Sequence, residues 1–156
     1  MAFIDFIIAT CAIIALGLSL YTHKRQISQD RAKKTQSLYQ EFFQPQMLSA
    51  RGKAWFFIQE LKEKNEIPSW KSIWSDKVYM DDVCNLYLVL SFWHSLRHHL
   101  EKKLVDNTLV IKLFSYEWEH WKSHMKPLVN VTGNKDDKLP EAMEPFQTTD
   151  WFPVEI

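Results

Sequence analysis

The N-terminal part of the chain is an almost uninterrupted run of apolar residues. Residues 2–21 read AFIDFIIATCAIIALGLSLY, and Asp5 is the one ionisable side chain among them. A helix of this length spans roughly 30 Å, which is the hydrocarbon thickness of a bilayer. The pattern therefore predicts a transmembrane helix over residues 1–21.

Basic residues follow this apolar run and do not precede it. They are Lys24, Arg25, Arg31, Lys33 and Lys34. A cleaved signal peptide would carry its basic residues on the N-terminal side. Because positive charge stays on the cytoplasmic side, we expect a single-pass signal anchor in the inner membrane, with the N-terminus outside and the rest of the chain in the cytoplasm.

Small residues recur every four positions within the apolar run, at Cys11, Ala15 and Ser19. Such a face lets two transmembrane helices approach closely. We consider it a candidate oligomer contact in the membrane. The alternative is that small residues are simply common in membrane spans.

The pattern after the run is helical almost throughout. No Gly or Pro interrupts residues 18–44, which predicts one helix over 3–43, and Pro45 suits the first position of a second helix over 45–65. One face of that second helix carries Met47, Ala54, Ile58 and Leu61.

Three further helical segments complete the predicted bundle. A short element starts at Pro68. A strongly apolar helix over 79–104 should be central, because apolar side chains cover almost all of its surface. One stripe consists of Leu86, Leu90 and Trp93, and much of the remaining surface carries Leu88, Phe92, Leu96 and Leu100. Asp106 is a candidate N-cap for a fifth helix, which should end near Lys126 because Pro127 disrupts it.

The C-terminal residues 133–156 hold three prolines and an excess of acidic side chains. We expect an irregular, solvated tail, with folding back onto the basic residues at 22–34 as the alternative. The predicted fold class is thus all-α. It comprises an anchor at 1–21, a cytoplasmic bundle of about four main helices at 22–132, and an acidic tail at 133–156.

Composition narrows the possible functions. The three glycines are scattered, which excludes the glycine-rich phosphate loops, and two cysteines cannot build a zinc ribbon or a disulfide framework. The formal net charge is zero. Since a general nucleic-acid binder would carry a basic face, we expect no specific nucleic-acid partner.

Several short stretches of the predicted bundle together resemble one family. They are Tyr39 to Phe43 (YQEFF), Pro45 to Arg51 (PQMLSAR), Leu86 to His94, Lys103 to Asp106 (KLVD) and Leu109 to Phe114. Over about residues 35–125 the chain is similar to an uncharacterised family of small single-pass bacterial membrane proteins with a helical domain of unknown function. The resemblance implies a membrane anchor and a helical bundle, and it supplies no catalytic residues.

The architecture is also similar to that of the small membrane accessory proteins of RNA-targeting CRISPR systems. This similarity points to a helical ribonuclease superfamily, whose motif is an arginine followed five to seven positions later by a histidine. No arginine of this chain has a histidine at that spacing. The resemblance therefore transfers no ribonuclease residues.

Two histidine pairs stand four residues apart, His94 with His98 and His120 with His124. That spacing can direct two imidazoles at one metal ion, and Glu117 precedes His120 by three residues. The two pairs would be offset by ~13 Å in an antiparallel hairpin, so they cannot share a metal. Glu117, His120 and His124 are a candidate metal cluster, although we regard ordinary surface histidines as the better interpretation and expect no cofactor.

Arg51 is an unusual charge on the predicted second helix. By helical spacing it lies on the apolar face, beside Met47, Ala54 and Ile58. An unpaired charge buried there would be costly, so we expect a structural ion pair, with an anion site as the alternative. The candidate carboxylates are Asp81, Asp82, Glu41 and Glu119.

These patterns favour a non-catalytic, membrane-anchored interaction or assembly subunit. It would act as a homo-oligomer or with another membrane-complex protein. One alternative is an oligomeric pore-forming or membrane-perturbing effector, for instance in defence against phage. Another is a helical-bundle nuclease or a metal- or haem-binding protein.

Overall fold

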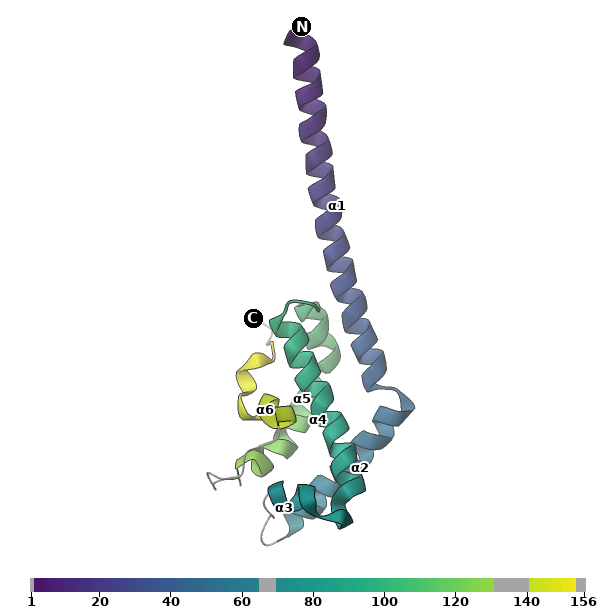
Figure 1. Cartoon of the computed structure of the whole chain (residues 1–156), viewed down its shortest axis with the longest axis vertical. Coiled ribbons are helices and arrows are strands. Elements are labelled where there is room, and N and C mark those ends of the chain that lie inside the picture. Colours follow the sequence, from purple (N-terminus) through teal and green to yellow (C-terminus); the bar gives the residue numbers. More distant parts are fainter. Residues whose placement is uncertain (1, 65–69, 131–140, 154–156) are drawn as a thin grey trace.

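The computed structural model describes residues 2–64, 70–130 and 141–153, and in these ranges the chain is helical without any strand (Figure 1). The predicted all-α fold class is confirmed. The elements are α1 (Ala2–Phe42), α2 (Pro45–Glu63), α3 (Trp70–Ser75), η1 (Lys77–Tyr79), α4 (Met80–Glu101), α5 (Asn107–Asn130), η2 (Glu141–Met143), α6 (Glu144–Gln147) and η3 (Thr149–Trp151).

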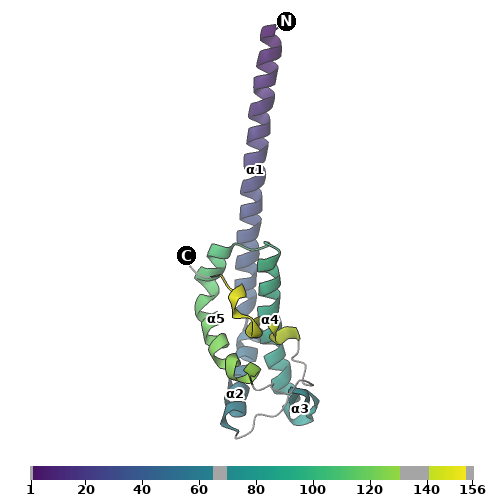
Figure 2. The same ribbon diagram turned by 90° about the vertical axis from the view of Figure 1, so that its left-hand side faces the viewer.

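Helix α1 is much longer than the bundle, and its N-terminal part extends away from the other helices (Figures 1 and 2). Side chains at 10–30 are exposed, whereas Thr35, Leu38 and Phe42 are buried against the bundle. We call residues 2–30 of α1 the arm. The single long helix predicted over 3–43 is confirmed.

The arm contains the segment that was predicted to span a membrane. Within the part of the chain that the structure describes, no helix has both the length and the apolar character to cross a bilayer. Met1 and the side chains of residues 2–9, which belong to the predicted span, lie outside that part.

Helices α2 and α4 form the centre of the bundle. Helix α2 begins at Pro45 as predicted, after the extended residue Gln44. Helix α4 packs against α2, α3, α6 and η2, which makes it the central helix that its composition predicts. The prediction that this helix is buried on nearly all sides is wrong at Leu88. The Leu88 side chain is 41% exposed, because the neighbours of α4 leave that side of the helix uncovered.

Helix α5 begins where the sequence predicts and ends later. The Asp106 carboxylate accepts a hydrogen bond from the backbone N–H of Leu109 at 2.9 Å, which confirms the N-cap. The predicted end at Lys126 is wrong, because the helix continues through Pro127 to Asn130. Proline in the last turn removes one backbone hydrogen bond, while burial of Leu128 holds that turn against the core.

The described part of the predicted tail, residues 141–153, packs on the bundle. Met143 and Phe146 are buried, and Phe146 and Phe152 stack on Trp118 of α5 with ring centroids 5.1 and 5.6 Å away. The prediction of a solvated tail is therefore wrong for these residues, because their apolar side chains outweigh the acidic ones. The predicted boundary at 132/133 lies outside the described residues.

An aromatic cluster joins α1, α4 and α5. Phe42 lies 4.5 Å from Phe92 and 5.4 Å from Trp93, while Trp93 lies 5.3 Å from Trp118 (ring centroids). These large side chains bury much apolar surface in tilted and edge-on contacts, which aromatic rings prefer. The cluster fixes the C-terminal part of α1 on the bundle and so sets the direction of the arm.

Candidate functional site

The arm exposes large apolar side chains on several sides. Ile13, Ile14, Leu16, Leu18 and Leu20 are between 56% and 71% exposed. At 100° per residue these positions span about 200° of the helix circumference, and no charged residue lies among residues 13–20, so the arm has no charged face like that of an amphipathic helix. A continuous exposed apolar surface of this kind marks contact with a membrane or another protein.

The residues of the predicted oligomer contact lie on this arm. Cys11, Ala15 and Ser19 are all exposed in the single chain and share one side of the helix. Their small side chains form a narrow strip between the larger Ile and Leu side chains. The geometry leaves this strip accessible to a second helix.

A groove of about 300 Å³ lies between α2 and α5 and contains Arg51. Arg51 Nη2 pairs with Glu117 Oε2, and the two side chains are only 14% and 16% exposed. The guanidinium also lies over the rings of Phe42 and Phe43, 4.1 and 5.1 Å from their centroids. The groove is lined by Leu48, Arg51, Gly52, Trp55, Tyr116, Glu117, His120 and Trp121.

The partner of Arg51 is none of the four carboxylates that the sequence suggested. Asp81 and Glu41 are exposed on other elements, whereas Glu117 faces α2 from α5. Glu117 could not be selected from the sequence, because the choice depends on how α5 is rotated against α2. Its helical spacing from Trp121 and Phe114 was the available signal, since it places Glu117 at the edge of the buried face.

His124 lies at the end of the same α2–α5 contact. The Trp55 Nε1–H donates to His124 Nε2 at 3.4 Å, and the Lys62 ammonium lies 3.2 Å from Nδ1. Burial lowers the pKa of His124, and the positive charges of Lys62 and His120 lower it further. Burial also lowers the pKa of Lys62. The site therefore favours the neutral imidazole. Protonation would place hydrogens on both ring nitrogens of His124 and leave no acceptor for the Trp55 N–H or the Lys62 ammonium.

The candidate metal cluster is not assembled as a metal site. His120 and His124 lie close together, with ring centroids 4.6 Å apart, but Glu117 is engaged by Arg51. Among the described residues, no group of three or more His, Cys, Asp or Glu side chains is placed to hold a metal ion. These side chains instead join α2 and α5 through the Arg51–Glu117 ion pair and the contact of Trp55 with His124.

Comparison with known proteins returned no match: no family model, no curated protein and no solved structure is similar to this chain.

Proposed function

We propose that this protein is a non-catalytic, membrane-anchored assembly subunit. The arm inserts into a bilayer through residues 2–21, and the helical bundle stays at the membrane surface. The observation that carries the proposal is the exposed apolar surface of the arm, from Ile13 to Leu20, on a helix that extends beyond the bundle (Figure 2). Burying such side chains in hydrocarbon is favourable by about 25 cal/mol per Å² of apolar surface.

The charges after the apolar segment support this placement. Lys24 and Arg25 come three and four residues after Tyr21, and Arg31, Lys33 and Lys34 follow about two to three turns later. Basic residues at this position favour the cytoplasmic side and interact with headgroups. The proposed location is the inner membrane, with the N-terminus outside and the bundle in the cytoplasm.

Self-association through the small-residue strip is the second part of the proposal. Cys11, Ala15 and Ser19 are exposed on one side of the arm, where close helix contact is sterically possible. A copy of the same chain is the proposed partner, which gives an assembly held together within the bilayer. The family resemblance of the sequence stays a prediction.

Flotation of the full chain with phosphatidylcholine vesicles tests the anchor. We expect the protein to float and to resist extraction by alkaline carbonate. Ile13→Lys combined with Leu16→Lys should abolish both properties, whereas Leu88→Lys, at an exposed position on α4, should leave them unchanged. A wild-type chain released by carbonate would overturn the anchor.

Cross-linking through Cys11 tests the strip. In a Cys84→Ser background, oxidation of two Cys11 thiols by copper phenanthroline should yield a covalent dimer in membranes. Ala15→Leu should suppress the dimer by separating the helices, while Gly17→Leu, two residues beyond Ala15 and so on the opposite side of the arm, should not. A strict monomer by mass photometry in detergent would contradict self-association and also exclude a pore.

A further inference from the structure

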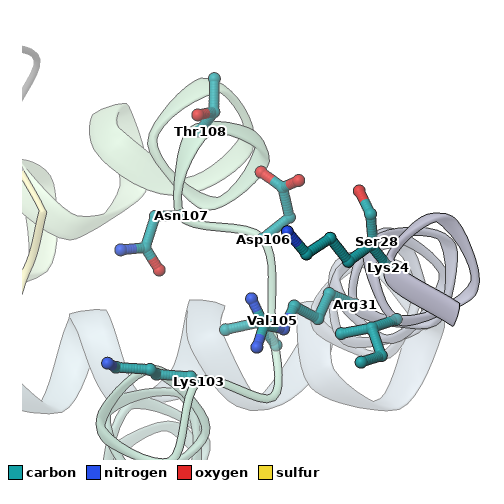
Figure 3. Close-up of a pocket in the computed structure, with 9 residues that line it drawn as sticks. Lys24, Ser28, Arg31, Lys103, Val105, Asp106, Asn107 and Thr108 are labelled. Carbon is teal, nitrogen blue, oxygen red and sulfur yellow. The ribbon is translucent and has the colours of Figure 1, made fainter. Parts of the chain in front are cut away.

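A basic notch lies where the arm meets the loop that joins α4 to α5. The notch has a volume of about 560 Å³ and continues into a neighbouring hollow of about 470 Å³. Figure 3 shows Lys24 and Arg31 reaching from α1 toward the segment 105–108, while Lys103 follows the end of α4 and its side chain extends away from α1 in this view. We define the basic notch by its five basic side chains, which are Lys24, Arg31, Lys34, Lys102 and Lys103.

Two acidic side chains also line the basic notch, so its net charge is three positive. They are Asp30 and Asp106. The Asp106 carboxylate is already used, because it accepts the hydrogen bond from the Leu109 N–H that caps α5. The excess of positive charge therefore remains available to an anion.

A buried hydrogen bond fixes the two walls of the basic notch relative to each other. Thr35, which is fully buried in α1, accepts a hydrogen bond from the backbone N–H of Asp106 at 3.0 Å and donates to the Arg31 carbonyl at 2.9 Å. Thr35 thereby joins the loop to α1 at a position one turn C-terminal to Arg31. The notch is thus a preformed feature of the fold.

Lys103 occupies a backbone conformation that usually belongs to glycine. Its φ is +55°, in the left-handed region. The N–H of Leu104 bonds the carbonyl of His99, and that of Lys103 bonds the carbonyl of Leu100, which is the Schellman pattern at a helix C-terminus. The Schellman hydrogen bonds hold Lys103 in this conformation and so fix where its side chain leaves the loop.

The membrane-facing end of the basic notch, at Lys24, lies at the depth of lipid headgroups if the arm spans a bilayer. Ile27, which lines it, is six residues beyond Tyr21, or about 9 Å along the helix. The headgroup layer extends roughly 5–8 Å beyond the hydrocarbon on each side. Lys24 lies about 4.5 Å beyond the hydrocarbon, within the headgroup layer, whereas Arg31 lies about 15 Å beyond it, so a phosphate bound by Arg31 lies inside the notch, past the general headgroup layer. Leu104 lines the neighbouring hollow and is 50% exposed.

We propose that the basic notch binds the phosphate group of an anionic phospholipid, with Lys24, Arg31 and Lys103 as the main contacts. This rests on the proposed membrane anchor, because the anchor brings the notch to the headgroups. The phosphate pairs with ammonium and guanidinium groups from α1 and from the loop between α4 and α5. Binding holds the bundle close against the membrane in one orientation relative to the arm.

Native mass spectrometry of the full chain in a neutral detergent tests the proposal. We expect phosphatidylglycerol to remain bound in preference to phosphatidylcholine. Arg31→Gln and Lys103→Gly should each weaken that preference about fivefold, which is the effect expected for one basic residue at an anionic surface. The control is Lys77→Gln with Lys126→Gln, which removes two exposed charges outside the notch and should leave the preference intact.

Lys103→Gly separates a binding role from a structural one. Relief of the left-handed conformation should raise the melting temperature while lipid binding weakens. Equal retention of the two lipids by the wild type, or a Lys103→Gly variant that binds phosphatidylglycerol as well as the wild type, would overturn the proposal. Inorganic phosphate that displaces the lipid and stabilises the chain equally would overturn the lipid assignment in favour of a free anion.

Failure of the anchor gives a different result. A chain that does not float with phosphatidylcholine vesicles disproves the proposed function, and the headgroup proposal fails with it. A chain that floats but shows no preference for phosphatidylglycerol disproves the headgroup proposal alone.

Discussion

Arg51 shows how this small bundle accommodates a charge between two helices. Its guanidinium lies against the faces of Phe42 and Phe43 and pairs with Glu117, so the positive charge interacts with both the aromatic rings and the carboxylate. Removing either partner leaves the other charge largely desolvated. The cost of losing one partner should therefore exceed the net contribution of the pair.

Arg51→Met and Glu117→Gln should each lower the free energy of unfolding by about 2 kcal/mol, because each leaves an uncompensated charge or polar group at a largely buried site. The double variant should lose clearly less than the sum of the two. Chemical denaturation in detergent measures all three. Strict additivity would show that the Arg51 and Glu117 side chains are not coupled. The control is Lys122→Ala, which removes the exposed pair with Glu119 and should lower the free energy of unfolding by under about 0.5 kcal/mol.

His124 should make stability depend on pH. Its pKa in the folded chain is below the ordinary value of 6.5, so the unfolded chain binds the proton more readily. The stability that comes from a neutral His124 is fully present above about pH 6.5 and is lost as the pH falls through the lower pKa of the folded state.

Melting temperatures measured on either side of pH 6.5 should therefore fall more steeply on the acid side for the wild type than for His124→Gln. The reason is that protonated His124 would face Lys62 and His120. His98→Gln, at an exposed position on α4, is the control and should keep the wild-type slope. A His124→Gln variant with an unchanged slope would contradict this assignment.

At the scale of elements, the loop between α4 and α5 is held at both ends. The Schellman pattern ends α4, Asp106 caps α5, and Thr35 ties the loop to α1. The predicted cap was found because a local spacing defines it. The sequence did not predict the hydrogen bond between Thr35 and Asp106, because these residues are 71 positions apart.

Thr35→Val should reduce the free energy of unfolding by about 1–2 kcal/mol, because the shape is kept while the buried Asp106 N–H loses its acceptor. The measurement is chemical denaturation of the full chain. Ser123→Ala, which removes an exposed hydroxyl bonded within α5, should change stability by less than about 0.5 kcal/mol. Equal effects of the two substitutions would show that the loop is not tied through Thr35.

At the scale of the whole molecule, the C-terminal segment completes the core. Trp118 contacts Phe146, Trp151 and Phe152, so residues far apart in the sequence together bury one of the two tryptophans of α5. The arm has the opposite character, because its apolar side chains have no such cover in the single chain. The C-terminal segment thus covers Trp118, whereas the apolar side chains along the arm are exposed.

Phe146→Ala should destabilise the bundle by about 3 kcal/mol, since it leaves a cavity beside Trp118. Phe56→Ala provides a matched control, because Phe56 is 69% exposed on α2 and its loss should cost under about 0.5 kcal/mol. Denaturant titration of both variants distinguishes them. Similar losses would mean that residues 141–153 do not pack as a part of the core.

The amino-acid sequence by itself determined the long helices α1, α2, α4 and α5 and most of their ends, but not the short helical elements at 141–151. Helical periodicity, Pro45 at the start of α2 and the Asp106 cap act within a few residues, so they can be recognised without a fold. Only the tertiary structure decided that Arg51 meets Glu117, that the predicted tail covers Trp118, and that Lys103 comes beside Arg31. These contacts depend on the rotation and register of helices against each other, which many distant side chains set jointly.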